Sequence, residues 1–525
     1  MPQMIDGPQA ALAAALAGLP GDLADAPDWS DEALRRAGLP VQTVTVTSVG
    51  GGLASFALVD QLRIRGLPAA DVAVVTDLAT PYQAFRRYAR NSQLGDTDRI
   101  RSDSAARIDN PWGFPSYAME EAVDELRPGP LLRSLTEPVL ATYFTPRAEQ
   151  VYAGIDREAR RIDWPAMVRP GTAAAVRRRA GGGFFVAWLP TGSPGLRVLR
   201  STVVHLGIGH SGMDFSEAAL DYRQRTGDRV RVVHAYEPHE HVYRTVTDLG
   251  GGTVLVQGAG ITSSQVIQRL ADDRRQHGLS TRIVQVTRSR PEPEVAHTGR
   301  RPRRDGIATQ PFSAPRSAFG GQLHQRLERS RGDDRRALDE LIARPSTADR
   351  RRWRRTLARA RSEGWYTHVT GELTSVEPSS VDTGQVLIAT CSPDRHPGDA
   401  PAPNDTVLGV DFVIECTGTA NRWEHHPLVT DALRLADGET GTDGALRVDP
   451  SFALAGTRDP ATGGALYGSG AELDRGPLGP RDSFWGMTFA AHRMADDLAA
   501  HGLCRSLGPL RSVAAWLRWV RERPA

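Results

Sequence analysis

The sequence of 525 residues contains no lysine, and all 64 of its basic residues are arginine. Without lysine the protein cannot form the Schiff base that holds a pyridoxal cofactor. It also cannot build the lysine-bearing phosphate loop found in many nucleotide hydrolases. Two large classes of phosphate-binding enzymes are therefore excluded at the outset.

Cysteine is also scarce, and the three that are present lie far apart. They are Cys391, Cys416 and Cys504. An odd number of distant cysteines builds neither a disulfide scaffold nor a zinc ribbon. No Cys-x-x-Cys pair is available as a redox dithiol. The histidine-rich run 234–241 gives no metal shell either, since strand alternation would set His234 opposite His239 and His241. We expect no bound metal.

Long apolar runs and a strong excess of charge are missing as well. No stretch approaches the ~18 apolar residues of a membrane span. The alanine-rich segment Ala10–Leu19 is preceded by no arginine, whereas a secretory signal needs a positive start. The formal net charge is only +2, which argues against nucleic acid or a membrane surface as a partner. We expect a cytoplasmic protein that binds neither.

Two glycine-rich turns stand out among the features that are present. One covers residues 50–55 and the other covers residues 258–263, and each follows a β-branched run and opens an apolar-periodic helix. This strand–turn–helix pattern is typical of dinucleotide-binding units. A chain of this length is expected to hold two or three domains. The fold class we predict is α/β, with two Rossmann-like domains.

The first turn fits the pattern Gly-x-Gly-x-x-Ser. Gly50 permits the tight bend, Gly52 lets a diphosphate approach the backbone, and Ser55 is small enough for the helix to pack on its strand. Leu53 and Ala54 begin the helix, whose N–H groups and dipole face the phosphates. A glycine turn without a ligand is the alternative.

An acidic residue at the end of the next strand is expected to bind ribose hydroxyl groups. Asp77 is our candidate, although it lies 27 residues after Gly50 (77 − 50) rather than the usual ~20. The loop Gly66-Leu67-Pro68 accounts for the difference. Thr76 is the alternative occupant of this position.

The second turn repeats the first. Its cofactor-binding candidates are Gly258, Gly260, Ile261 and Ser263. The following strand ends in Arg288 and Arg290 without an acid, and a basic end suits the 2′-phosphate of NADPH. The alternative is two ordinary surface arginines in an arginine-rich chain.

Strand and helix patterns divide the chain into four segments. We expect a leader with short helices over 1–39, a first FAD-binding part over 40–235, an NADPH-binding domain over 236–420, and a second FAD-binding part over 421–525. An arginine-rich insertion over about 290–365 is expected to be a solvated helical hairpin.

Four further segments support a resemblance to a known family. The strand ends Gly207–Gly209 and Thr417-Gly418 resemble the two crossings between the FAD and NADPH domains of two-dinucleotide flavoproteins. Gly470 resembles the end of the late FAD strand, although Ala471 replaces the usual aspartate. Met487 and Thr488 resemble the start of the helix that points at the flavin. Lacking Cys-x-x-Cys, the chain is most similar to class B flavin monooxygenases.

The resemblance implies an α/β fold in which the second Rossmann-like domain is inserted into the first. It also implies bound FAD and NADPH, with O2 and a small molecule as substrates. Candidates for the flavin face are Asn91, Gln93 and Trp112, in a segment (80–165) that is rich in arginine and aromatic residues. Ordinary packing and turn roles are the alternative for these residues. The nearby arginines favour an anionic or amino-acid-like substrate.

Two other functions remain open at this stage. One is an NADPH-dependent flavin reductase that uses an acceptor other than oxygen. The other is a non-catalytic nucleotide-binding protein. A homo-oligomer is compatible with each of these functions.

Overall fold

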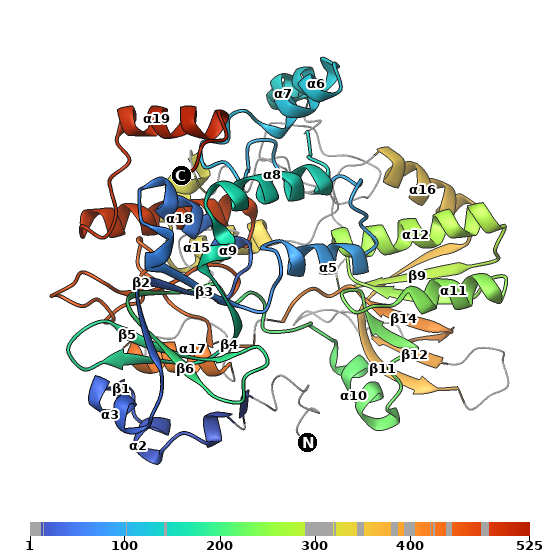
Figure 1. Cartoon of the computed structure of the whole chain (residues 1–525). Coiled ribbons are helices and arrows are strands. Elements are labelled where there is room, and N and C mark those ends of the chain that lie inside the picture. Colours follow the sequence, from blue (N-terminus) through green and yellow to red (C-terminus); the bar gives the residue numbers. More distant parts are fainter. Residues whose placement is uncertain are drawn as a thin grey trace.

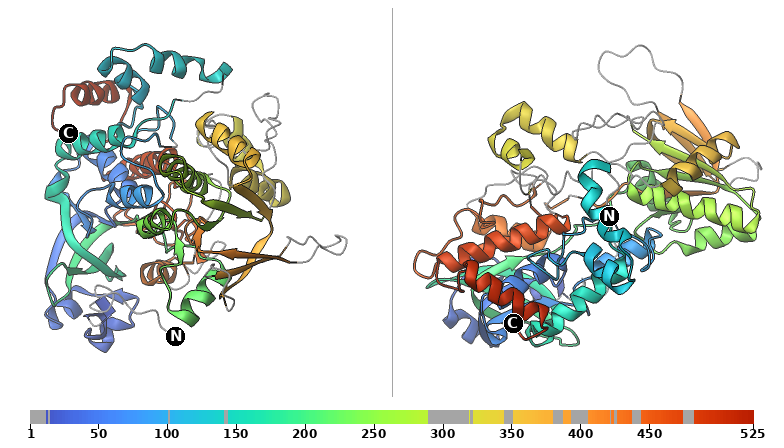
Figure 2. Two further views of the ribbon diagram at one scale, coloured as in Figure 1. Left: turned by 90° about the vertical axis from the view of Figure 1, so that its right-hand side faces the viewer. Right: turned by 90° about the horizontal axis from the view of Figure 1, so that it is seen from above.

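Two lobes lie side by side, each built on its own β-sheet (Figures 1 and 2). The computed structural model describes residues 12–13, 15–100, 102–140, 144–288, 319, 322–343, 351–379, 387–392, 405–420, 422–423, 426–436, 444–473 and 482–525. Within these residues, no helix is both long enough and apolar enough to cross a lipid bilayer.

The first lobe holds a sheet that is seven-stranded in the described part of the chain, with the order β1-β4-β3-β2-β6-β15. All six of these strands run parallel to their neighbours, and β5 pairs antiparallel with β4 and β6. Their bounds are β1 Asp28–Trp29, β2 Val41–Val49, β3 Val72–Thr76, β4 Val168–Arg179, β5 Phe184–Pro190, β6 Arg197–Leu206 and β15 Leu466–Gly468. Valine-rich strands such as β3 are buried along their whole length, as parallel strands covered on both faces are.

The second lobe holds a parallel sheet with the order β10-β9-β8-β14-β7, and a smaller antiparallel sheet, β11-β12-β13. The bounds are β7 Val232–His234, β8 Thr253–Gln257, β9 Arg282–Thr287, β10 Tyr366–Thr370, β11 Glu372–Pro378, β12 Leu387–Ser392, β13 Thr406–Val410 and β14 Phe412–Glu415. All of these strands lie in the sequence between β6 and β15 of the first sheet. The predicted α/β fold, with one domain inserted into the other, is confirmed.

Helices cover both sheets (Figure 1). In the first lobe they are α2 Gly21–Ala24, α3 Asp31–Arg36, α4 Leu53–Ile64, η1 Ala69–Asp71, α5 Gln83–Asn91, α6 Tyr117–Asp124, α7 Gly129–Leu140, α8 Ala148–Arg161, α9 Trp164–Met167, α17 Pro427–Leu435, α18 Phe484–Ala500 and α19 Pro509–Val520. Those between β6 and β14 are α10 Glu217–Thr226, α11 Glu240–Asp248, α12 Ile261–His277, α14 Gln322–Arg329, α15 Gly332–Ala343 and α16 Arg351–Ser362.

The first domain ends earlier than the sequence suggested. Strand β7, which the expected boundary after residue 235 assigns to the first domain, pairs with β14 in the second sheet. Short apolar strands carry no signal of the sheet they join, so the boundary was drawn too late. The crossing lies at residues 207–216, directly after β6.

The arginine-rich insertion packs more closely than a solvated hairpin would. Trp353 and Leu357 of α16 are buried in the core of the second lobe. Leu327 of α14 and Leu338 of α15 form a small cluster against α18 of the first lobe. Residues 289–318 of the insertion lie outside the described part of the chain.

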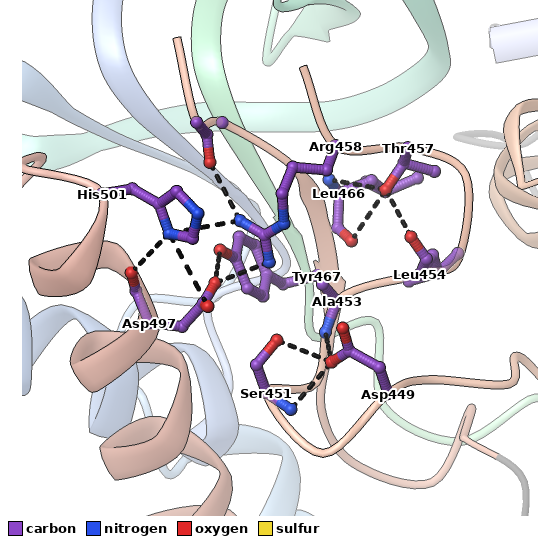
Figure 3. Close-up of polar contacts among 12 residues, drawn as sticks. Asp449, Ser451, Ala453, Leu454, Thr457, Arg458, Leu466, Tyr467, Asp497 and His501 are labelled. Atoms are coloured by element: carbon purple, nitrogen blue, oxygen red, sulfur yellow. Dashed lines mark hydrogen bonds and ion pairs between the residues drawn. The ribbon is translucent and has the colours of Figure 1, made fainter. Parts of the chain in front are cut away.

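A polar cluster fixes the end of α18 to strand β15 (Figure 3). Arg458 and Tyr467 both donate to Oδ2 of Asp497, the first at 2.7 Å. His501 Nδ1 lies 2.8 Å from the backbone carbonyl of Asp497. Burial raises the pKa of the Tyr467 hydroxyl, which therefore stays a donor. At the other end of α18, the Phe484 ring packs 5.6 Å from Phe85 of α5, so α18 spans the first lobe in a fixed direction.

The two chain crossings between the lobes pair with one another. The N–H of Asp214 donates to Gly418 (3.2 Å), and the N–H of Ala420 donates to Gly212 (3.0 Å). Just before the second crossing, Glu415 is fully buried and accepts the N–H and hydroxyl of Ser216, both at 3.0 Å. Burial raises the pKa of the Glu415 carboxyl to about 7.

We predict that Glu415→Gln weakens the pH dependence of stability. The folded protein holds this proton more tightly than the unfolded chain, whose pKa is near 4.5. The stabilisation is therefore complete below pH 4.5 and lost as pH rises through 7. Urea unfolding across this window should show a free energy of unfolding that falls less steeply in the variant, by about 3 kcal/mol in total. Equal pH dependence of the free energy of unfolding in the variant and the wild type would contradict this prediction. Glu377→Gln, at an exposed position, serves as the control.

Candidate functional site

The first glycine turn is locked by backbone contacts on both sides. The Gly50 N–H donates to Val75 of β3, and the Gly207 N–H donates to Val49 of β2, each at 2.9 Å. Gly50 has a φ of +89°. A side chain there would place its Cβ 2.2 Å from the carbonyl oxygen of Gly207. Only glycine fits where the two strands approach this closely.

The mouth of this turn is open on the side that a ligand would approach. A Cβ at Gly51 would strike the side chain of Thr76 at 2.5 Å, but a Cβ at Gly52 would meet nothing within 4 Å. Gly52 is also the N-cap of α4, and no side chain caps that helix. Free N–H groups at a helix start, with space before them, form an anion site. The residues that begin this helix, Leu53, Ala54 and Ser55, are buried against the sheet.

The second glycine turn makes the same backbone contacts as the first, with Ala259 in the place of Gly51. The Gly258 N–H donates to Val286 of β9 (2.9 Å), and the Cys416 N–H donates to Gln257 of β8 (2.7 Å). A Cβ at Gly258 would lie 2.4 Å from the Cys416 carbonyl oxygen, whereas a Cβ at Gly260 would meet nothing. No side chain caps α12 at Gly260. We call these two structures the first and second cradles.

The crossings complete the correspondence between the cradles. Cys416 occupies the place of Gly207, so the segment Cys416-Thr417-Gly418 corresponds to Gly207-Ile208-Gly209. Gly209 and Gly418 both have positive φ, +84° and +102°. The Thr417 hydroxyl donates to the carbonyl of Asp214 and so ties the second crossing to the first.

Residues of opposite charge stand at equivalent places in the two cradles. Asp77 lies two residues beyond Val75, and Arg288 lies two residues beyond Val286, the two acceptors of the cradle glycines. Both side chains are exposed. The hydrogen bonds and ion pairs found among the described residues include neither side chain. Arg290, the other predicted cation, lies outside the described residues.

A buried histidine beneath the first cradle was missed by sequence reasoning. His205 on β6 bonds to Ser48 of β2 through Nδ1 (2.9 Å) and to Ser469, just after β15, through Nε2 (2.7 Å). Burial lowers the pKa of His205 to about 3, so the ring is neutral. It links three parallel strands at the level of the glycine turn. The sequence signal for this contact was a polar residue near the end of each otherwise apolar strand, His205 in β6 and Ser48 in β2.

The side chains of Ser263 and Thr488 form hydrogen bonds within the first turns of α12 and α18. The Ser263 hydroxyl donates to the Gly260 carbonyl (2.8 Å) within the first turn of α12, and Ser263 is fully buried. The Thr488 hydroxyl donates to the Phe484 carbonyl (2.9 Å), and Met487 is buried. Helix α18 begins at Phe484, four residues before Thr488, and its N-cap Ser483 accepts the Gly486 N–H.

Gly470 has a φ of +115° in the loop that follows β15. The sequence offers no aspartate at the next position. The structure places a fully buried carboxyl one residue further on, at Glu472, with Oε2 3.0 Å from where a Cβ on Gly470 would lie. A side chain at residue 470 would crowd this carboxyl.

Asn91 and Gln93 contact the second lobe. Asn91 donates its amide N–H to the backbone carbonyl of Tyr236 (2.6 Å), and Gln93 Oε1 accepts from Arg269 (3.3 Å). Both partners belong to the second lobe. Both amides therefore lie between the lobes, and their position at the flavin face stays a prediction.

The contacts of Trp112 support the packing alternative. Its indole donates to Ser512 of α19 (2.9 Å). Two further indoles of α19, those of Trp516 and Trp519, donate to backbone carbonyls of the loop 109–114. The orientation of Trp112 is thus set by the last helix of the chain.

The histidine-rich run does not lie on one strand, as the sequence argument assumed. His234 ends β7 and accepts the Tyr236 N–H (3.1 Å), whereas His239 is the residue just before α11 and bonds to Tyr243 (3.0 Å). His241 bonds to a backbone carbonyl. Each ring has a protein partner.

Comparisons with known proteins give a structural likeness only. No protein-family profile and no curated sequence matches this chain. Among solved structures, the ornithine hydroxylase PvdA from Pseudomonas aeruginosa has a TM-score of 0.60 at 14% identity, covering 88% of this chain and 100% of that one.

Two other solved structures are alike to a similar degree. FAD-bound DfoA, a cadaverine monooxygenase from Erwinia amylovora, has a TM-score of 0.63 at 12% identity, over 88% of this chain and 96% of that one. The ornithine N-hydroxylase KtzI from Kutzneria sp. 744 has a TM-score of 0.59 at 13% identity, over 88% and 100%. This chain has the two-domain dinucleotide-binding fold of these flavin-dependent hydroxylases.

Proposed function

We propose that this protein is an FAD- and NADPH-dependent monooxygenase that oxidises a small, amine-bearing or amino-acid-like molecule with O2. The observation that carries the proposal is the pair of cradles with the same backbone wiring and opposite charges at equivalent places. A ribose with free hydroxyls suits an acid, and a 2′-phosphorylated ribose suits an arginine. The solved structures that resemble the chain include an ornithine hydroxylase and a cadaverine monooxygenase.

The first cradle fits FAD. The open side of Gly52 and the uncapped N-terminus of α4 suit its diphosphate. Asp77 would accept hydrogen bonds from the hydroxyls of the adenosine ribose. Neutral His205 holds the strands beneath the cradle together without adding a buried charge.

The second cradle fits NADPH. The N-terminus of α12 would bind the diphosphate, and the exposed guanidinium of Arg288 would make charge-assisted bonds to the 2′-phosphate. When bound, the two cofactors supply hydride transfer and oxygen activation. The chain itself contributes binding and orientation. The sequence has no Cys-x-x-Cys pair for a dithiol relay. Burial also raises the pKa of the Cys391, Cys416 and Cys504 thiols.

The most direct test of this function is a visible spectrum followed by reduction. Purified protein should show oxidised-flavin bands near ~370 and ~450 nm that NADPH bleaches under nitrogen. Readmitted oxygen should then restore the colour and, with a suitable amine, give hydroxylated product in step with NADPH use. Bleaching without oxygen-coupled product would identify a reductase instead. No bleaching would leave only nucleotide binding.

Substituting alanine for two glycines of the first cradle should have different effects on stability and on flavin binding. Gly50→Ala places a methyl group against a backbone oxygen at positive φ, so we expect a large loss of thermal stability. Gly52→Ala meets no protein atom, so the fold should remain while bound flavin is lost. Melting temperature and flavin content of the purified variants check this. A Gly52→Ala protein with full flavin content would contradict the cradle.

Arg288→Ala should change the choice of nucleotide. Removing a charge-assisted bond of about 1.5–3 kcal/mol weakens NADPH binding by roughly ten-fold or more, and NADH binding is expected to stay the same. Titration calorimetry with both nucleotides measures the effect. Arg282→Ala, an exposed arginine at the opposite end of β9, is the matched control. Equal losses for both nucleotides would contradict the assignment.

A further inference from the structure

Helix α5 lies between the two lobes (Figure 1). It belongs to the first lobe, where Phe85 packs against Phe484 of α18. Its last residue, Asn91, donates its amide to the backbone carbonyl of Tyr236 in the second lobe at 2.6 Å. An amide donor at this distance is a well-formed bond that fixes both partners.

Tyr236 continues the connection into the second cradle. Its hydroxyl lies 3.3 Å from the hydroxyl of Thr262, in the first turn of α12. Its ring packs 5.2 Å from Tyr88 of α5 and 5.3 Å from His234. One half-buried residue therefore contacts both the first lobe and the helix start that would bind the nucleotide diphosphate.

A second contact lies one step along the chain. Gln93 follows α5 with a φ of +65°, a conformation that few side chains adopt without a reason. Its Oε1 accepts from Arg269 of α12 at 3.3 Å. Arg269 is itself held by Glu240 and Asp273 at 2.9 and 2.8 Å. The guanidinium therefore presents a fixed donor to Gln93.

The covalent connections between the lobes do not fix their orientation strongly. Two chain crossings, paired by the few backbone bonds around Gly212 and Gly418, form a narrow hinge. Lobes joined by such a hinge rotate unless other contacts select one orientation. The cluster of α14 and α15 against α18 is one such contact. A net hydrogen bond shifts an equilibrium by roughly 3- to 10-fold, so the two amide contacts together add measurably to the selection.

We propose that Asn91 and Gln93 are positioning residues that hold the second cradle at a fixed position and orientation relative to the first lobe. Together with Tyr236 and Arg269 they form an interlobe clasp at the end of α5. The clasp sets the distance between the nicotinamide and the flavin and leaves the affinity of each cradle unchanged. This inference rests on the proposed function, since it concerns hydride transfer between the two cofactors.

The sharpest variant is Asn91→Asp. It keeps the shape of the side chain, but it replaces the N–H donor with an oxygen that repels the Tyr236 carbonyl. Gln93→Asn tolerates positive φ and is one methylene too short to reach Arg269. Gln83→Ala, at the other end of α5, removes an amide that accepts from Ala79 within the same lobe, and it serves as the matched control.

Two measurements are made on each flavin-loaded variant. Calorimetry gives the dissociation constant of NADP⁺, and stopped-flow bleaching under nitrogen gives the rate constant of flavin reduction. We expect Asn91→Asp to lower the reduction rate about ten-fold and the double variant to lower it further. The NADP⁺ dissociation constant should stay within two-fold of wild type. Gln83→Ala should match wild type in both.

A third measurement does not depend on the cofactors. Amide hydrogen exchange in α5 and in residues 234–238 should be faster in Asn91→Asp than in Gln83→Ala. If exchange and reduction rates match wild type in every variant, the clasp is refuted. If NADP⁺ affinity falls and the reduction rate does not, the residues belong to the nucleotide site and the clasp is also refuted. If wild-type flavin is not reduced by NADPH, the proposed function fails, and the exchange comparison alone still judges the clasp.

Discussion

The structure depends on a close approach of backbone to backbone, made twice. In each lobe the carbonyl oxygen of a neighbouring strand end lies against the Cα of a glycine, Gly207 against Gly50 and Cys416 against Gly258. This contact turns the chain sharply at the carboxyl edge of the sheet, and it leaves the next helix uncapped and facing open space. Parallel sheets place ligands at this edge, where neighbouring strands diverge. Anion binding then follows from the helix N–H groups.

Sequence patterns were enough for the parts of the fold that glycine and β-branched residues specify. Both cradles and their order followed from residues 50–55 and 258–263, since steric demands on φ leave few alternatives there. The inserted arrangement followed from the resemblance of the strand ends Gly207–Gly209 and Thr417-Gly418 to the domain crossings of two-dinucleotide flavoproteins. Asp77 and Arg288 were predicted because each follows the second strand of a glycine-turn unit. Their equivalent places in the two cradles support that interpretation. Contacts made over long sequence distances were not visible. The hydrogen bond from Trp112 to α19 and the packing of the arginine-rich helices against α18 join segments that are far apart in the sequence.

The amides of Asn91 and Gln93 show why site residues are harder to predict than folds. Their proximity to a cofactor domain was readable, but their direction was not, because the partner carbonyl at Tyr236 is 145 residues away. The same applies to His205, whose partners Ser48 and Ser469 come from distant strands. Both cases place polar side chains between elements that must keep a fixed geometry. Asn91 and Gln93 thus bear on the orientation of the lobes, whereas His205 bears on the rigidity of the first cradle.

The most direct measurement of the central claim is a crystal structure of the protein soaked or co-crystallised with FAD and NADP⁺. Our account predicts one diphosphate against Gly52 at the start of α4 and another against Gly260 at the start of α12. The first ribose should lie beside Asp77 and the 2′-phosphate beside Arg288. Density for either diphosphate elsewhere, or a cradle closed by neighbouring side chains, would contradict it.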